Sequence, residues 1–232
     1  LPYVESTRAA LKYMIDTKKY AKPCIMHQDD EYGKSVLDGF KQELTALKMT
    51  PTAITSYKRG ASDFSAQVAK MKSDGCDLVV LGTVIRETIG AMGEAKKLGW
   101  KVDFLGATPT NVLEVPALGK EAVEGLYAAA GFEIPYEDTA KGKVKDWLAT
   151  YKKEFGSSAN TQAIIGYNAM MTFAHYAKKA GKDLTGAKML DALESGDVFQ
   201  DIFGSPPTKF SKTNHLASTV TQVQQVKNGR WV

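Results

Sequence analysis

The sequence predicts an α/β fold in which a doubly wound, mainly parallel sheet is covered by helices. Short apolar runs alternate with amphipathic helical patterns as far as Gly131, and the clearest run is residues 78–82. Strands that are apolar throughout and are joined by helices are typical of a parallel sheet buried on both faces. Right-handed crossovers then place helices on both sides of the sheet.

Each element of this sheet is predicted by its own pattern. The first helix carries Ala10, Leu11, Met14 and Ile15 at helical spacing. Strands are predicted at 24–26, 52–57, 78–82, 102–105 and 125–130. The helix between the first two strands carries Val36, Phe40, Leu44 and Leu47 on one side. The next helix carries Phe64, Val68 and Met71 on one side, with Ser62 or Asp63 as its cap, and a further helix is predicted at 87–98.

Beyond Gly131 helices dominate the predicted structure. They are expected at 143–155, with Val144, Trp147, Leu148 and Tyr151 inward, at 162–180 and at 186–194. No strands are predicted among them, so these helices are expected to cover a sheet whose strands lie elsewhere. The chain then closes with an alternating strand at 218–227, an Asn228-Gly229 turn and a short return strand, which together predict a hairpin.

Composition excludes several classes of protein. The net charge of +4 comes from lysine pairs scattered over helix surfaces, whereas a nucleic-acid binder concentrates basic residues on one face. No apolar run approaches the ~18 residues of a membrane span. No signal-peptide pattern opens the chain, so it is expected to be mature, cytoplasmic or trimmed.

The two cysteines are too few for a disulfide framework. Cys24 and Cys76 both lie at the start of a predicted strand, and the preferred interpretation is two buried thiols. A single disulfide between neighbouring strands is the alternative, because oxidising compartments permit one.

The topology itself predicts where a ligand binds. In open α/β sheets, ligands lie beyond the carboxyl ends of the strands where the strand order reverses. For the order 2-1-3-4-5 that point falls between the strand ending at His27 and the strand ending at Gly82. The loops that face it are 28–33 and 83–87, with 108–111 beside them. Their candidate contacts are Tyr32 as an aromatic wall, Thr83 and Thr108 as hydroxyls, and Arg86 as an anion partner.

Structural roles compete with these assignments. In the alternative interpretation Tyr32 only packs on the next helix. Arg86 then forms an ion pair with Glu87 or Asp30 at the surface. The Gly33-Lys34-Ser35 segment superficially suggests a phosphate loop, but Gln28 stands where that motif needs a glycine.

The sequence carries no enzyme signature. Neither a nucleophile elbow nor a zinc-protease motif occurs. His27, His175 and His215 are isolated from one another in the sequence. We therefore expect no catalysis, no metal and no cofactor.

Several motifs, in their order and spacing, carry a resemblance over essentially the whole chain. They are residues 22–33 with Asp-Asp-Glu-Tyr-Gly, residues 63–65, 77–82, 95–99, 104–106 and 123–126, and the closing Val-Lys-Asn-Gly-Arg-Trp-Val. This set resembles the leucine/isoleucine/valine-binding family of type I periplasmic solute-binding proteins, which serve ABC transporters.

The resemblance implies two hinged lobes with a ligand held between them. Residues 1–131 correspond to the second lobe, 132–213 to helices returning to the first lobe, and 214–232 to strands rejoining the second. The family's first-lobe sheet should precede Leu1. The implied function is an extracytoplasmic, periplasmic receptor for a small molecule that docks on a membrane permease. A ligand-sensing part of a receptor or regulator with the same fold is the alternative.

The resemblance also assigns contacts to the ligand. Tyr32 matches a ligand-contacting tyrosine, and Gln162 matches a residue lining the pocket. Val84 stands where amino-acid binders often have an aromatic residue, and Thr108 stands where they have an acid that pairs with the ammonium. Without that acid an ammonium lacks its counter-charge. We therefore expect an aromatic or aliphatic carboxylate or a small amide, and an amino acid only if Asp30 or Glu87 substitutes.

Overall fold

The computed structural model describes residues 1–232 and divides them into two compact units. The sheet unit joins Pro2–Ala130 to Val220–Val232. The helical unit comprises Gly131–Thr219, together with Leu1. Each unit has its own secondary structure and packing. The assignment of residues 132–213 to a first lobe stays a prediction.

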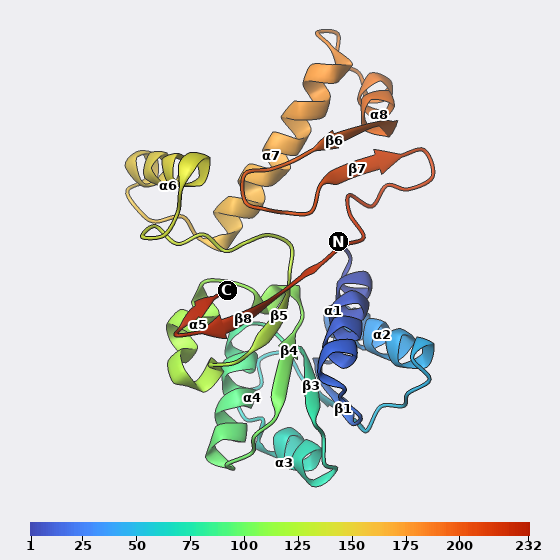
Figure 1. The fold of residues 1–232 in the computed structure, drawn as a ribbon, viewed down its shortest axis with the longest axis vertical. Helices are drawn as coiled ribbons and strands as arrows, with labels where there is room; N and C mark the ends of the chain where they lie inside the picture. Colours follow the sequence, from blue (N-terminus) through green and yellow to red (C-terminus); the bar gives the residue numbers. More distant parts are fainter. The chain divides into compact units, whose positions relative to one another are not determined.

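The sheet unit is built on a seven-stranded sheet in the order β2-β1-β3-β4-β5-β8-β9 (Figure 1). The first five strands pair in parallel, and β8 pairs antiparallel with β5. The bounds are β1 Pro23–Gln28, β2 Ala53–Tyr57, β3 Leu78–Gly82, β4 Asp103–Gly106, β5 Tyr127–Ala130, β8 Gln222–Lys227 and β9 Arg230–Trp231. The predicted doubly wound parallel sheet and its strand order are confirmed.

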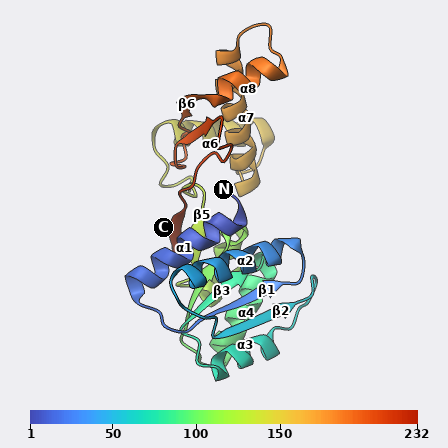
Figure 2. The same cartoon turned by 90° about the vertical axis from the view of Figure 1, so that its right-hand side faces the viewer.

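Helices cover both faces of this sheet. α1 and α2 lie over one face, and α3 and α4 lie over the other (Figure 2). The helical bounds are α1 Tyr3–Lys18, α2 Glu31–Ala46, α3 Ser65–Ser73, α4 Ile85–Lys97 and α5 Glu114–Gly119, with short turns η1 Thr108–Thr110 and η2 Lys120–Val123. The N-cap of α3 is Phe64, so the prediction of Ser62 or Asp63 as its cap is wrong. Asp63 lies one residue earlier and accepts a hydrogen bond from the amide of Ser65 at 2.9 Å.

The main core lies between α1, α2 and the sheet. The predicted stripe of α1 is buried, and Phe40 and Leu44 of α2 are fully buried beside it. All of them belong to one cluster with Ile25 of β1 and Val80 of β3. Burying an aliphatic or aromatic side chain of this size stabilises the fold by about 1.5–3 kcal/mol. This cluster therefore fixes β1 and β3 in place.

The terminal hairpin forms as predicted, although β8 begins at Gln222 and not at Ser218. Asn228 and Gly229 both have positive φ, of 52° and 72°, which a two-residue turn of this kind requires. Trp231 then donates its indole N–H to the carbonyl of Val112 at 2.9 Å. The end of the chain is thus anchored to the sheet unit.

The helical unit contains a small sheet that the sequence did not predict. Its bounds are α6 Gly142–Phe155, α7 Thr161–Ala180, α8 Gly186–Glu194, β6 Ser195–Phe199 and β7 Thr208–Ser211. β6 and β7 pair antiparallel. The expectation of helices without strands is therefore wrong. Both strands are short and carry polar residues, so no apolar run identifies them.

Aromatic contacts hold the helical unit together. The fully buried Tyr176 of α7 donates to the carbonyl of Asp197 in β6 at 3.0 Å. The ring of Trp147 in α6 lies 5.0 Å from that of Phe203. Of the four residues expected to face inward on α6, Leu148 alone is buried, and Val144, Trp147 and Tyr151 are partly exposed.

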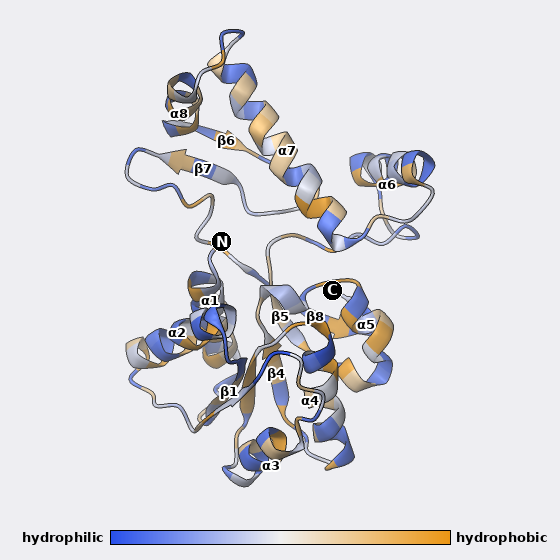
Figure 3. Ribbon diagram, turned by 180° about the vertical axis from the view of Figure 1, so that it is seen from behind, coloured by the Kyte–Doolittle hydropathy of each residue, from blue (hydrophilic) through white to orange (hydrophobic).

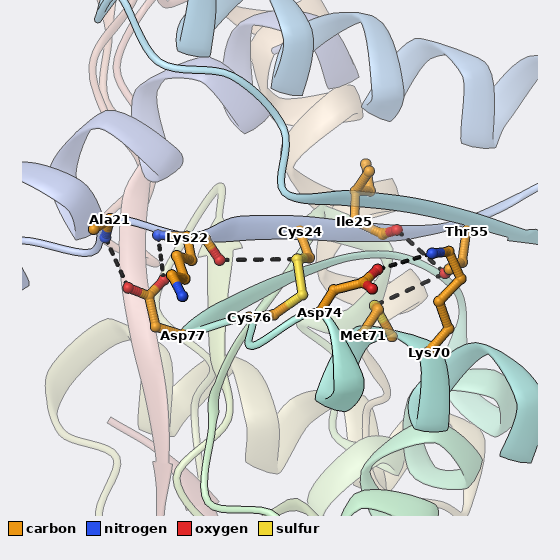
Figure 4. The surroundings of a disulfide bond; sticks show 10 residues. All are labelled: Ala21, Lys22, Cys24, Ile25, Thr55, Lys70, Met71, Asp74, Cys76 and Asp77. Carbon is orange, nitrogen blue, oxygen red and sulfur yellow. Dashed lines mark hydrogen bonds and ion pairs between the residues drawn. A yellow bond between two sulfur atoms is a disulfide. The ribbon is translucent and has the colours of Figure 1, made fainter.

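Cys24 and Cys76 form a disulfide, so the preferred interpretation of two buried thiols is wrong (Figure 4). Cys24 is in β1 and Cys76 precedes β3, and these two strands are neighbours in the sheet. Adjacent strands lie about 4.8 Å apart, and the two Cα atoms are 5.9 Å apart, within the range that a disulfide spans. Asp77, just before β3, also links the starts of the two strands. Its carboxylate accepts hydrogen bonds from the backbone amides of Ala21 and Lys22, which precede β1.

We predict that this disulfide contributes substantially to the stability of the sheet unit. It closes a loop with a sequence separation of 52 residues, which should stabilise the fold by about 2–4 kcal/mol. Urea unfolding of the oxidised protein and of the Cys24→Ser/Cys76→Ser variant measures the difference. An unchanged midpoint, together with two titratable thiols in the denatured, unreduced protein, would contradict the prediction.

Candidate ligand-binding site

A cavity of about 400 Å³ opens in the sheet unit beside the carboxyl ends of β1 and β3. We call it the strand-end cavity. The end of β1, the loop after β2 and the start of α4 form it. Its lining residues are Gln28, Arg59, Gly60, Val84, Ile85, Arg86 and Glu87. The strand order reverses at this point, because β2 lies on the far side of β1 from β3. The cavity therefore lies where the topology predicts a ligand.

The loop after β1 is held tightly against the start of α2. Asp30 caps this helix, and its carboxylate accepts from the amide of Gly33 at 3.0 Å and from the side-chain amide of Gln28. A Cβ on Gly33 would lie 1.9 Å from the carbonyl oxygen of Gln28, so only glycine fits here. The anion site at the start of α2 is thus already occupied by the chain's own carboxylate.

Hydrogen bonds to Asp30, chiefly that from the amide of Gly33, lower the pKa of its carboxyl below the ordinary value. A carboxyl with a lower pKa in the folded state stabilises the fold above its unfolded pKa. That contribution is lost as the pH falls through the folded pKa. The stabilising contribution of Asp30 is therefore fully present at neutral pH.

Tyr32 connects α2 to the end of β3. Its hydroxyl donates to the carbonyl of Thr83 at 2.9 Å, and its ring packs edge-on against Tyr3 at 4.9 Å. Burial raises the pKa of Tyr32 well above its ordinary value. Tyr32 is not among the residues lining the cavity. Its contacts place the loop that begins at Thr83, and its direct contact with ligand stays a prediction.

The hydroxyl of Thr83 is engaged within the protein. The residue is fully buried, and its Oγ1 lies 2.6 Å from Oγ1 of Thr88 in α4. Thr88 in turn donates to the carbonyl of Val84 at 2.6 Å. These bonds fix the turn from β3 into α4, which presents the next residues to the cavity.

Val84 and Arg86 do line the cavity, as does Arg59 from the loop after β2. The Val84 side chain is partly exposed at the start of α4. The guanidinium of Arg86 is largely exposed, and its Nη2 lies 3.8 Å from Oε1 of Glu87. Two cationic side chains at the mouth of a cavity attract an anionic solute electrostatically.

Glu87 is the residue of the site that sequence reasoning underrated. Its side chain is only 3% exposed, although it lines the cavity. Oε2 has no hydrogen-bond partner. A buried carboxylate without full pairing is costly for the fold, on the order of several kcal/mol. Its place in the first turn of α4 offsets part of that cost through the helix dipole.

A second buried polar group without a partner lies at the end of β2. The hydroxyl of Tyr57 is buried and has no hydrogen-bond partner. Burial raises the pKa of Tyr57, and the negative charges of Glu87 and Asp30 add to the effect. Tyr57 precedes the loop that carries Arg59, and the sequence interpretation considered only the loops after β1, β3 and β4.

The two remaining predicted contacts lie outside the strand-end cavity. Thr108 is half-buried in η1 after β4, and its carbonyl accepts from the amide of Asn111 at 3.1 Å. Gln162 belongs to the helical unit, where it is exposed in the first turn of α7. Their roles as ligand contacts stay predictions.

No group of three or more His, Cys, Asp or Glu side chains is arranged to hold a metal ion. None of the helices combines the length and the apolar character that a membrane crossing requires.

Comparison with known proteins places the chain among binding proteins. A family model described as "Periplasmic binding protein" matches residues 2–230. A "Leu/Ile/Val-binding protein homolog 2" of Brucella abortus is 31% identical over 193 residues, which are 83% of this chain and 50% of that protein. A "Leu/Ile/Val-binding protein homolog 3" of Brucella melitensis is 24% identical over 95% of this chain and 58% of its own length. The chain spans about half the length of the curated relatives it matches.

Solved structures show the same fold. A branched chain amino acid ABC transporter protein from Thermus thermophilus with bound valine has a TM-score of 0.83 at 20% identity, covering 99% of this chain and 63% of that one. A solute binding protein of an ABC transporter from R. palustris, in complex with benzoate, has a TM-score of 0.78 at 18% identity, covering 99% and 62%. At these identities the likeness establishes the fold and not the ligand.

Proposed function

This chain belongs to the periplasmic binding protein family, and from that premise we propose that it carries part of the ligand-binding surface of an extracytoplasmic receptor for an ABC importer. The receptor binds a small organic acid, aromatic or aliphatic, or an amino acid, and delivers it to a membrane permease. Binding without turnover is the activity proposed. Structural relatives described with valine, with benzoate and as a fatty acid transporter protein support this range of solutes.

The observation that carries the proposal is the strand-end cavity itself. It lies at the switch point of the sheet and combines two arginines with a buried glutamate. A cavity with an apolar residue and a few convergent charged groups is typical of a small-molecule site. Arg59 and Arg86 suit the carboxylate of an incoming solute, because a guanidinium forms charge-assisted hydrogen bonds with it.

The disulfide supports a location outside the cytoplasm. Disulfides such as Cys24–Cys76 persist in oxidising compartments and are rare where thiols are kept reduced. The family described as periplasmic binding proteins supports the same location.

We further propose that α7 packs against a first lobe formed by chain that precedes Leu1 in the complete protein. α7 carries several exposed apolar residues, with Ile165, Met170, Met171 and Phe173 between 38% and 63% exposed, and its ribbon is largely coloured as apolar (Figure 3). Large apolar side chains exposed together on one element usually mark a contact surface. The shorter length of this chain relative to its relatives supports the proposal. Ligand then closes the two lobes about their hinge.

We predict that the complete protein is stabilised by at least one of valine, leucine, benzoate and octanoate. A ligand that binds only the folded state raises the melting temperature by mass action.

Arg86→Ala should weaken binding of the stabilising solute roughly tenfold, since a charge-assisted bond is lost, and titration calorimetry measures the change. Lys41→Ala, at an exposed position of α2, is the control and should leave the affinity unchanged. Full affinity in the Arg86→Ala variant would contradict our placement of the carboxylate.

We predict that Phe173 behaves as a core residue in the complete protein. Phe173→Ala should lower the free energy of unfolding by about 3 kcal/mol, as truncation of a buried phenylalanine does. Lys178→Ala, at an exposed position of the same helix, should change it by less than about 0.5 kcal/mol. If both substitutions lower the free energy of unfolding by equally small amounts in chemical denaturation, no lobe covers Phe173 of α7.

A further inference from the structure

Glu87 is not explained by the packing of the sheet unit. Its side chain is 3% exposed, and Oε2 has no hydrogen-bond partner. Nearly all buried polar groups in native proteins are hydrogen-bonded, so each exception calls for a reason. A glutamate in the first turn of a helix often bonds back to the backbone as part of a cap. Because Oε2 has no partner, a capping role does not account for that oxygen.

The neighbouring charges leave this oxygen available. The nearest cation is Arg86, whose Nη2 lies 3.8 Å from the other oxygen, Oε1. That separation is longer than a hydrogen bond, and the guanidinium is 80% exposed, so water screens the pair. The carboxylate also stands at the N-terminus of α4, where the helix dipole favours a negative charge. A residue with an unpaired acceptor oxygen thus lies at the wall of the cavity.

The groups around the cavity fit a solute with two polar ends. Arg59, Arg86 and Glu87 all line the cavity. The two arginines suit a carboxylate, and Glu87 has an acceptor oxygen without a hydrogen-bond partner. A solute that carries both a carboxylate and a hydrogen-bond donor satisfies both kinds of group.

We propose that Glu87 determines the specificity of the strand-end cavity by accepting a hydrogen bond from an ammonium or hydroxyl group of the solute. This inference rests on the proposed receptor function. From the sequence, Asp30 and Glu87 are the acids that could replace the missing acid at Thr108. Asp30 is already engaged with the amide of Gly33 and with Gln28. Glu87 is therefore the acid we select. A solute that lacks a donor leaves Oε2 unpaired and is bound less tightly.

Two matched pairs of solutes test the proposal on the complete protein. They are leucine against 4-methylpentanoate, and 4-hydroxybenzoate against benzoate, and each pair differs in the donor group. The protein should bind the donor-bearing member of at least one pair roughly tenfold or more tightly than its partner, as a site built to accept a donor discriminates against solutes without one. Titration calorimetry gives the four affinities.

Glu87→Gln separates the two kinds of donor. It keeps the shape and an acceptor oxygen but removes the charge, so an ammonium ligand should lose about a hundredfold in affinity and a hydroxyl ligand about tenfold or less. Solutes without a donor should bind the variant as before. Glu94→Gln, on the same helix, is the control and should change nothing. Thermal melting of both variants checks that the fold is retained.

The outcomes distinguish this inference from the proposed function. Equal affinity for both members of each pair, or an equal effect of Glu87→Gln on both members, overturns the role of Glu87 and leaves the receptor function standing. Failure of the unmodified protein to bind any of the four solutes, or any of the wider panel above, counts against the receptor function itself.

Discussion

The parallel pairing of β1 with β3 is the constraint on which the rest of the sheet unit depends. Pro23 pairs with Leu78 at one end, and His27 pairs with Gly82 at the other. Because β2 lies on the opposite side of β1, the connections after β1 and β3 leave the sheet in different directions and open a crevice between them. The same register brings the cysteines together at the amino ends of these strands. One pairing thus sets both the disulfide and the strand-end cavity.

Most of the sheet unit could be predicted from local patterns. Residues 78–82 are apolar throughout and form a fully buried strand. Helices between the strands then predicted a parallel, doubly wound sheet, and the assumed order 2-1-3-4-5 is the one observed. The Asn228-Gly229 turn was predictable because few residues tolerate two successive positive φ angles. The strands β6 and β7 were missed because their pairing is made by backbone bonds between short polar segments, which leave no periodic signal.

The chemistry of the site was less accessible to sequence reasoning than its location. The switch point identified the loops, and Val84 and Arg86 line the cavity that forms there. Burial of Glu87 depends on tertiary packing, and a glutamate in the first turn of a helix is ordinary in sequence. Thr83 has a hydroxyl suited to a ligand, but the nearby Thr88 occupies it. Sequence indicates which side chains reach a loop and not which of their polar atoms remain unpaired.

If solute binds at the carboxyl ends of β1 and β3, it should protect the backbone amides of the loops there. Amide hydrogen exchange of the complete protein, with and without the tightest-binding solute, measures this protection. We expect ligand to slow exchange at residues 57–60 and 84–88, where the cavity-lining loops lie, and to leave the loops at the opposite edge, 74–77 and 98–101, unchanged. Unchanged exchange at 84–88, with slowing at the opposite edge, would show that solute binds elsewhere on the protein.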